Sequence, residues 1–141
     1  MQLWGLDLAQ IQGGRQPIAL CEAAMVPLSL MEWPELYRGR HVVWYVDNTS
    51  AMHSFVKGAA KDAALERLVN ITWMLAFHLR CSIWFEWVDT DSNWADNLSR
   101  DLKDCRFTRE LGYGPTQMQS GLQFWELGWR ELWEELMRLT D

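Results

Sequence analysis

Three things are scarce in this sequence of 141 residues: cysteine, basic charge and long apolar runs. The three cysteines, Cys21, Cys81 and Cys105, have neither a paired nor a metal-binding spacing, so we expect small core side chains in a reducing compartment. No apolar run approaches the ~18 residues that a membrane span needs. The segment Met1–Gln10 lacks a basic part followed by an apolar one. These features predict a soluble, intracellular protein without a signal peptide, with nucleus and cytoplasm not distinguished.

Basic residues are outnumbered, because 13 Lys and Arg stand against 19 Asp and Glu, for a net charge of -6. Phosphate binding is dominated by Lys and Arg, so the composition gives no support to a nucleic-acid partner. It does not exclude one, since a nuclease site is itself acidic and recruits metal ions. What the sequence has in excess is tryptophan, with ten residues. Their indole N–H groups need partners, so some are expected at interfaces or half-exposed.

The order of expected elements indicates an α/β domain. An apolar helix is expected over Ile18–Met31, kinked or split at Pro27. His41–Val46 is a run of strand formers with apolar residues on both faces, which predicts a central strand covered on both sides. Two helices, a second strand and a short helix follow: Asn48–Val56, Asp62–Leu79, Ser82–Val88 and Asn93–Leu102. A connection of this length predicts a right-handed βαβ unit with parallel strands.

We divide the chain into a domain over residues 1–101 and an appendage over residues 102–141. The appendage is read as an irregular connection and an amphipathic helix with a capping box at Ser120 and Gln123. Its apolar face comprises Trp125, Trp129, Leu132, Trp133 and Leu136. We expect this helix to pack on its own domain, with docking of a partner as the alternative. The segment Trp84–Trp87 is likewise expected to be core rather than a base-stacking platform.

Three carboxylates stand where packing alone would not place them. Glu22 lies on the apolar helix, where a buried carboxylate needs a cation, unless it stands at the helix start and complements the dipole. Asp47 follows the first strand, at the sheet edge where ligands gather, unless it caps the next helix. Asp96 lies on the helix after the second strand and can approach Asp47, unless it only complements a helix start capped by Asn93. Asp89 and Asp91 are read as turn formers.

Together the three carboxylates predict an oxygen-only site. Hard divalent ions such as Mg²⁺ prefer oxygen ligands. Two such ions, about 3.5–4 Å apart, stabilise both the attacking and the leaving oxygen in phosphodiester cleavage. We therefore predict that Glu22, Asp47 and Asp96 converge at one edge of the sheet.

Three segments of the sequence resemble motifs of a known family. Residues 43–51, VWYVDNTSA, look like the strand and Asp-Asn-x-x-Ala motif of ribonuclease H domains in retroelement reverse transcriptases. Residues 93–100, NWADNLSR, resemble the Asn-x-Ala-Asp-x-Leu-Ser-Arg signature of the same domains. Residues 18–22, IALCE, are similar to the helix that carries their second acidic residue. The similarity covers residues 16–101, and the motif at residues 93–100 is its most specific part.

The resemblance implies a ribonuclease H-like mixed sheet with helices, in a retroelement polyprotein. It implies hydrolysis of the RNA strand of an RNA–DNA hybrid, dependent on Mg²⁺ or Mn²⁺, with Glu22, Asp47 and Asp96 as catalytic metal ligands. Weaker nucleic-acid contacts are expected at Asn48, Ser50 and Arg100, and pairing with Asp96 is the equal alternative for Arg100.

The family begins with a three-stranded meander that bears a further catalytic Asp. Too few residues precede Glu22 for that meander, and Met1–Gln12 supplies at most one strand or a helical turn. We therefore expect a domain truncated at its N-terminus, with an incomplete two-metal site and doubtful activity. The alternatives are a non-catalytic interaction module that keeps the fold, and a transposase or resolvase nuclease, against which the motif at residues 93–100 argues.

Overall fold

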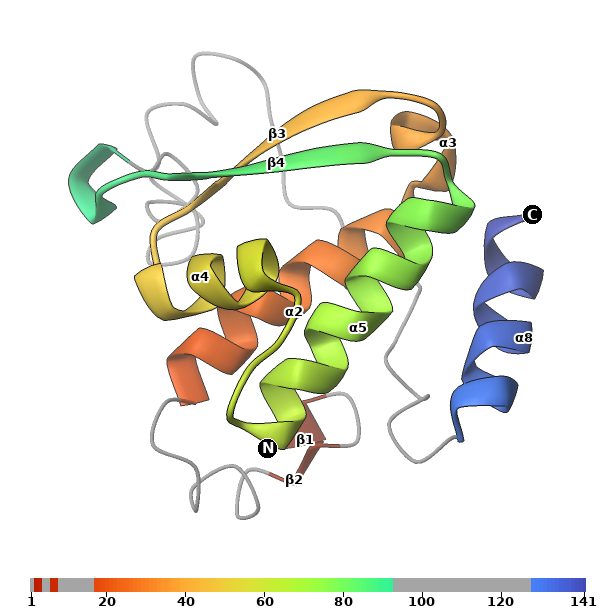
Figure 1. Ribbon diagram of the computed structural model, residues 1–141, viewed down its shortest axis with the longest axis horizontal. Helices are drawn as coiled ribbons and strands as arrows, with labels where there is room; N and C mark the ends of the chain where they lie inside the picture. Colours follow the sequence, from red (N-terminus) through yellow and green to blue (C-terminus); the bar gives the residue numbers. More distant parts are fainter. Residues whose placement is uncertain (1, 4–5, 8–16, 93–127) are drawn as a thin grey trace.

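The computed structural model of the protein describes residues 2–3, 6–7, 17–92 and 128–141, and they form a mixed α/β structure (Figure 1). Its main sheet is a parallel pair of strands, β3 (His41–Val46) and β4 (Ser82–Trp87). His41 pairs with Ser82 and Val46 with Trp87, so the two strands run in register over their whole length. The α/β class and the parallel pairing predicted from the sequence are confirmed.

Two helices make the connection between the strands. α4 (Thr49–Lys57) and α5 (Ala63–His78) lie with the earlier helix α2 (Pro17–Glu32) on one side of the sheet (Figure 1). Each begins at a side-chain cap: Asn48 Oδ1 accepts from the backbone N–H of Ala51, and Asp62 Oδ1 accepts from that of Leu65, both at 2.9 Å. Such caps satisfy N–H groups that the first helical turn leaves without a helical partner. Local sequence therefore fixes where both helices start.

The apolar helix predicted around Glu22 is α2 (Pro17–Glu32), followed by the short helix α3 (Pro34–Tyr37). α2 runs through Pro27 as one helix, so of the two expected effects of this proline, a kink or a split, the split is wrong. Nearly every residue from Ala23 to Met31 is buried, with Met25 as the exception. Because this surface packs against α5 and α4, burial offsets the hydrogen bond that a proline removes.

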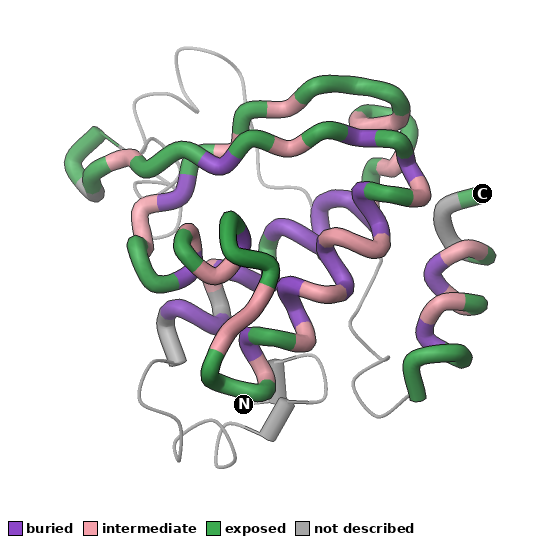
Figure 2. The backbone as a smooth tube through the Cα atoms, in the orientation of Figure 1, coloured by how far each residue is buried: buried purple, intermediate pink, exposed green. Residues whose placement is uncertain are grey.

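The core lies between the sheet and the helices. Figure 2 shows buried residues concentrated along α2 and α5, whereas much of the sheet is exposed. Phe55 of α4 stacks on Phe85 of β4 with ring centroids 4.6 Å apart, and Trp73 of α5 meets Phe85 edge to face at 5.9 Å. Cys81 is buried in this core, as predicted, and burial raises the pKa of its thiol.

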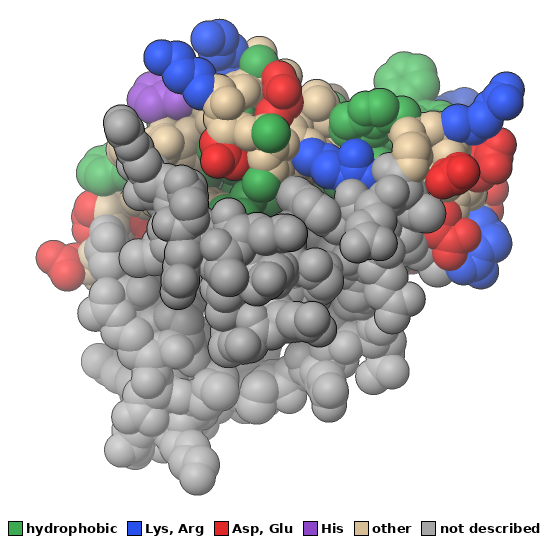
Figure 3. All heavy atoms as spheres, turned by 90° about the horizontal axis from the view of Figure 1, so that it is seen from below, with side chains coloured by type: hydrophobic (Ala, Val, Ile, Leu, Met, Phe, Trp, Pro, Cys, Tyr) green, Lys and Arg blue, Asp and Glu red, His purple; other side chains and the backbone are tan. Residues whose placement is uncertain are grey.

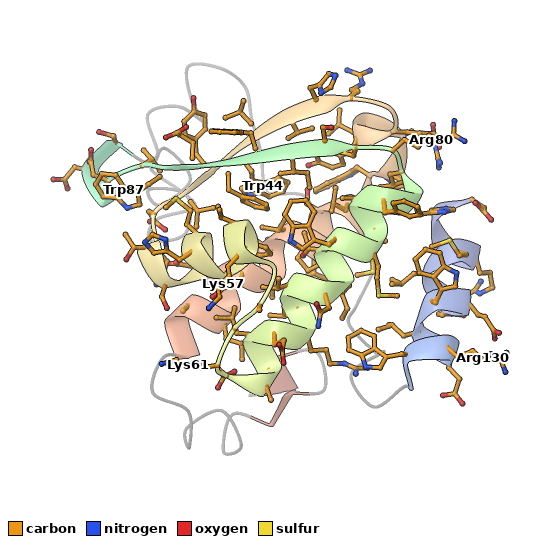
Figure 4. All side chains as sticks on the ribbon, in the orientation of Figure 1. Trp44, Lys57, Lys61, Arg80, Trp87 and Arg130 are labelled. Atoms are coloured by element: carbon orange, nitrogen blue, oxygen red, sulfur yellow. The ribbon has the colours of Figure 1, made fainter. Side chains whose placement is uncertain are left out.

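Among the described residues, helices cover only one face of the sheet, which corrects the expectation of a strand buried on both sides. Val42, Trp44 and Val46 face the helices, whereas Val43 and Tyr45 are 55% and 62% exposed. In Figure 4, Trp44 points from the strand toward the helical layer. On β4, Phe85 is buried, but Trp84 and Trp87 are 68% and 47% exposed, so the expectation that Trp84–Trp87 is core is wrong for both tryptophans.

The C-terminal helix, α8 (Trp129–Thr140), begins later than the sequence predicted. Gly128 precedes it in extended conformation, and its N–H lies 3.4 Å from Glu131 Oε2. Ser120, Gln123 and Trp125 lie outside the described residues. Leu132 and Leu136 are fully buried in the same core as α2 and α5, but Trp129 is 48% exposed. The leucines, more than the tryptophans, hold α8 to its own chain.

At the other end of the chain, β1 (Gln2–Leu3) and β2 (Leu6–Asp7) pair antiparallel. Two short strands therefore stand where at most one strand or a helical turn was expected. None of the helices that the structure describes is long and apolar enough to cross a bilayer.

Candidate functional site

Asp47 directly follows β3 and is half-buried. Just beyond the paired strands, the N–H of Val88 donates to the carbonyl of Val46 at 3.0 Å. This bond holds the segment after β4 beside the residue that precedes Asp47. Asp47 therefore stands at the carboxyl edge of a parallel sheet, the edge at which α/β proteins bind ligands.

The helix that follows Asp47 is capped by Asn48, whose Oδ1 accepts from Ala51 N–H. Ala51 is fully buried, which keeps the first turn of α4 close to the core. The reading of Asp47 as the helix cap is thus wrong, because its neighbour performs that task. Asn48 itself uses its side-chain oxygen in the cap, and Ser50 is exposed on the first turn with its carbonyl accepting from Ser54 Oγ at 2.9 Å.

Glu22 lies in the second turn of α2, which has no acidic residue in its first turn. The favourable interaction between a carboxylate and the helix dipole falls off beyond the first turn. It therefore does not explain why Glu22 stands at this position. Its side chain is half-buried, with Oε2 itself buried. α2 packs against α4, the helix that starts just after Asp47.

The third predicted ligand, Asp96, and the predicted phosphate contact, Arg100, lie outside the described residues. Among the residues described, no group of three His, Cys, Asp or Glu is arranged to hold a metal ion. Glu22 and Asp47 supply the hard oxygen donors that Mg²⁺ prefers, but a pair of carboxylates does not complete such a site. The convergence of all three carboxylates stays a prediction.

Asp89 is a turn former, as predicted. Its Oδ1 accepts from the N–H of Ser92 at 2.9 Å and its Oδ2 from the hydroxyl of Ser92 at 3.0 Å. Asp91 is exposed within the same short turn, η1 (Thr90–Ser92). Both oxygens of Asp89 are thus used in local structure, at the carboxyl end of β4.

The sequence reading missed the exposed aromatic residues of the sheet. Tyr45 and Trp84 lie on the face away from the helices, and Trp84 Nε1 donates to Glu86 Oε2 at 2.9 Å. By strand alternation, Ser82, Trp84 and Glu86 share one face of β4. Two of these three residues are polar, and this pattern indicates a face exposed to solvent.

Comparisons with protein-family models, with curated proteins and with solved structures found no match.

Proposed function

We propose that this chain is a ribonuclease H-like domain that hydrolyses the RNA strand of RNA–DNA hybrids with the help of divalent metal ions. The observation that carries the proposal is the position of Asp47. It stands at the carboxyl end of β3, in a parallel strand–helix–helix–strand unit, and the adjacent residue takes the capping role. A carboxylate at this edge, relieved of capping, suits ligand binding.

The residues that would hold the metal are Glu22, Asp47 and Asp96, whose oxygens suit Mg²⁺ or Mn²⁺. Bound ions of this kind supply an activated water and stabilise the charge on the attacking and leaving oxygens. The chain's contribution is orientation. The parallel pairing fixes the backbone before Asp47 and the Asn48 cap fixes it afterwards, so the backbone is held on both sides of Asp47.

Metal binding tests the proposal first. We expect the purified chain to bind Mn²⁺ weakly. Asp47→Asn and Asp96→Asn should each weaken binding by at least about tenfold, since even outer-shell partners of metal ligands cost that much. Asp62→Asn is the matched control, because asparagine and aspartate cap helices about equally well. Unchanged Mn²⁺ affinity in Asp47→Asn overturns the assigned site.

Cleavage of a labelled RNA–DNA hybrid tests the activity. We expect slow cleavage or none from this chain alone, because too few carboxylates leave the ions poorly fixed. Robust cleavage that EDTA and Asp47→Asn both abolish would show that the site is complete without the family's first Asp. Cleavage that survives Asp47→Asn would remove Asp47 from the mechanism.

A second candidate is a non-catalytic interaction module, favoured by an apolar groove of about 470 Å³ between α5 and α8. Its lining residues are Asn70, Trp73, Met74, Phe77, Trp129 and Trp133. Phe77 is 79% exposed at this groove and adds to the apolar surface that a partner would cover. Sedimentation velocity tests self-association through the groove: a dimer that Phe77→Glu dissociates supports this candidate, and a monomer at every concentration counts against it.

A further inference from the structure

The sheet face away from the helices carries aromatic side chains in the open. By strand alternation this outer face consists of His41, Val43 and Tyr45 from β3 and Ser82, Trp84 and Glu86 from β4, and all six residues are exposed. Tyr45 and Trp84 are 62% and 68% exposed. Aromatic rings exposed together on one sheet face are a feature of interaction surfaces.

Tyr45 and Trp84 are diagonal neighbours, because Trp84 pairs with Val43 and Glu86 pairs with Tyr45. A strand spacing of ~4.8 Å and a rise of ~3.3 Å per residue put them about 8 Å apart. The indole N–H of Trp84 is bonded to Glu86, so the polar edge of the ring is satisfied. Two neighbouring exposed rings on one sheet face form a surface on which successive bases of an extended strand can stack.

Exposed arginines stand at the amino end of the same sheet. The N–H of Ser82 donates to the carbonyl of Arg40 at 2.9 Å, and that of Gly39 donates to the carbonyl of Leu79 at 2.8 Å. These bonds bring Arg40 next to the turn that carries Arg80, and both residues are exposed. Figure 4 shows Arg80 at this end of β4. In a chain of net charge -6, two adjacent exposed arginines at one sheet end are a local basic site suited to phosphates.

Rings and basic charge also meet between α5 and α8, where Arg67 lies over Trp129 beside a groove that Phe77 lines, but there the guanidinium already contacts a ring of its own chain. At the end of the molecule where α8 lies, acidic and basic side chains are mixed (Figure 3). The helix carries Arg130 and Arg138 among Glu131, Glu134 and Glu135. Lys57 and Lys61 lie on the helical side of the sheet (Figure 4).

We infer that the outer face of the sheet binds single-stranded nucleic acid, with bases stacked on Tyr45 and Trp84 and phosphates held by Arg40 and Arg80. Binding requires neither a metal ion nor catalysis, so the inference stands apart from the proposed nuclease activity. Glu86 lies on the same face, toward the carboxyl end of the sheet, and its carboxylate repels phosphates. The phosphates are therefore expected at the end of the sheet that carries the arginines.

Fluorescence anisotropy with a labelled oligothymidine of about 12 nucleotides, within the usual range of site sizes, tests the inference in EDTA. Trp84→Ala and Tyr45→Ala should each raise Kd by about tenfold, as expected for the loss of one stacked base. Trp84→Phe keeps a ring and should lose less. Glu86→Gln removes a negative charge while keeping an oxygen for the indole N–H, and should tighten binding.

Salt dependence tests the phosphate contacts. Replacing both Arg40 and Arg80 with glutamine should reduce the slope of log K against log salt by about 1.4, that is ~0.7 for each contact with a single strand. Arg130→Gln, on α8, is the matched control and should leave the slope unchanged. A poly-uridine RNA of the same length should behave like the DNA, because stacking does not depend on the sugar.

Phe77→Ala removes an exposed aromatic ring from the groove instead of the sheet and should leave Kd unchanged. Three results overturn the inference. The first is that the wild-type chain does not bind the oligonucleotide, and the second is that Phe77→Ala and Trp84→Ala weaken binding equally. The third is that Trp84→Ala lowers the melting temperature by more than about 4 °C. The last result would show that the sheet face is packed in solution rather than open.

Discussion

The guanidinium of Arg67 lies over the indole ring of Trp129, with Cζ 4.9 Å from the ring centroid. This contact joins α5 to the first residue of α8. At the other end of α8, His78 Nε2 lies 3.1 Å from Asp141 Oδ1, and the His78 ring meets Trp133 edge to face at 6.4 Å. The two helices are thus linked near both ends of α8, through polar and aromatic contacts at the rim of a leucine-based packing surface.

The leucines should dominate the stability of this packing. Leu132→Ala, which empties a fully buried position, should lower the free energy of unfolding by about 2–5 kcal/mol. Trp129→Ala removes a half-exposed ring and its cation–π contact, and should cost about 1 kcal/mol or less. Urea unfolding followed by circular dichroism measures both. A larger loss from Trp129→Ala than from Leu132→Ala would mean that the aromatic face of α8, and not its leucines, holds the helix.

The Asn48 cap ties the candidate site to the stability of α4. Asn48→Ala removes the acceptor for Ala51 N–H and should destabilise the protein by about 0.5–2 kcal/mol. Asn48→Asp keeps a capping oxygen and should be nearly neutral. Thermal melting compares the two variants with Asp62→Ala, which removes the equivalent cap of α5. Equal melting temperatures for Asn48→Ala and the wild type would show that the cap is not formed in solution.

Most of the helices and strands could be predicted because their signals are local. The caps at Asn48 and Asp62 and the stop at Gly58, which takes a left-handed conformation (φ 74°), depend on a few neighbouring residues. The run of strand-forming residues predicted a strand over His41–Val46, and the structure has β3 over the same residues. The position of Asp47 at the strand end followed directly, and with it one member of the candidate site.

The exposure of the sheet could not be predicted in this way. Val42, Val43, Trp44 and Tyr45 are apolar or aromatic on both faces, a pattern typical of strands covered on both sides. Which face is covered depends on where distant elements pack, and that information is not local to the strand. The convergence of Glu22, Asp47 and Asp96 is likewise a long-range property. It was predicted from the connection rule for parallel strands, and the described residues establish only that the helix carrying Glu22 packs against the helix that follows Asp47.

The buried thiol of Cys81 should make stability fall at alkaline pH. Burial raises the pKa of Cys81 above that of an unfolded thiol, about 8.5. Above that pH the unfolded chain loses the proton while the folded chain keeps it, so the free energy of unfolding decreases as pH rises. The stabilising contribution is complete below the unfolded pKa and lost as pH passes through the folded one. Cys81→Ala should therefore show a shallower decline than the wild type in urea titrations from neutral to alkaline pH, and identical declines would contradict the prediction.

The contact between Trp73 and Phe55 should couple α5 to the end of α4. The last carbonyls of a helix have no partner within the helix, and Phe55 lies in the last turn of α4. Trp73 Nε1 donates to the carbonyl of Phe55 at 3.0 Å and so satisfies one of them. Trp73→Phe keeps an aromatic ring near Phe85 but leaves this half-buried carbonyl without its donor, which should cost about 1–3 kcal/mol.

Phe85→Ala provides the comparison, because it removes the ring that Phe55 and Trp73 both contact. A cavity at this position should cost about 3–5 kcal/mol, more than the loss of the hydrogen bond alone. The double variant tests whether the two contacts act as one unit. Since Trp73 and Phe85 touch, the combined loss in urea unfolding should differ from the sum of the single losses by about 0.5 kcal/mol or more. Strict additivity would mean that the hydrogen bond and the ring cluster stabilise the α4–α5–β4 core independently.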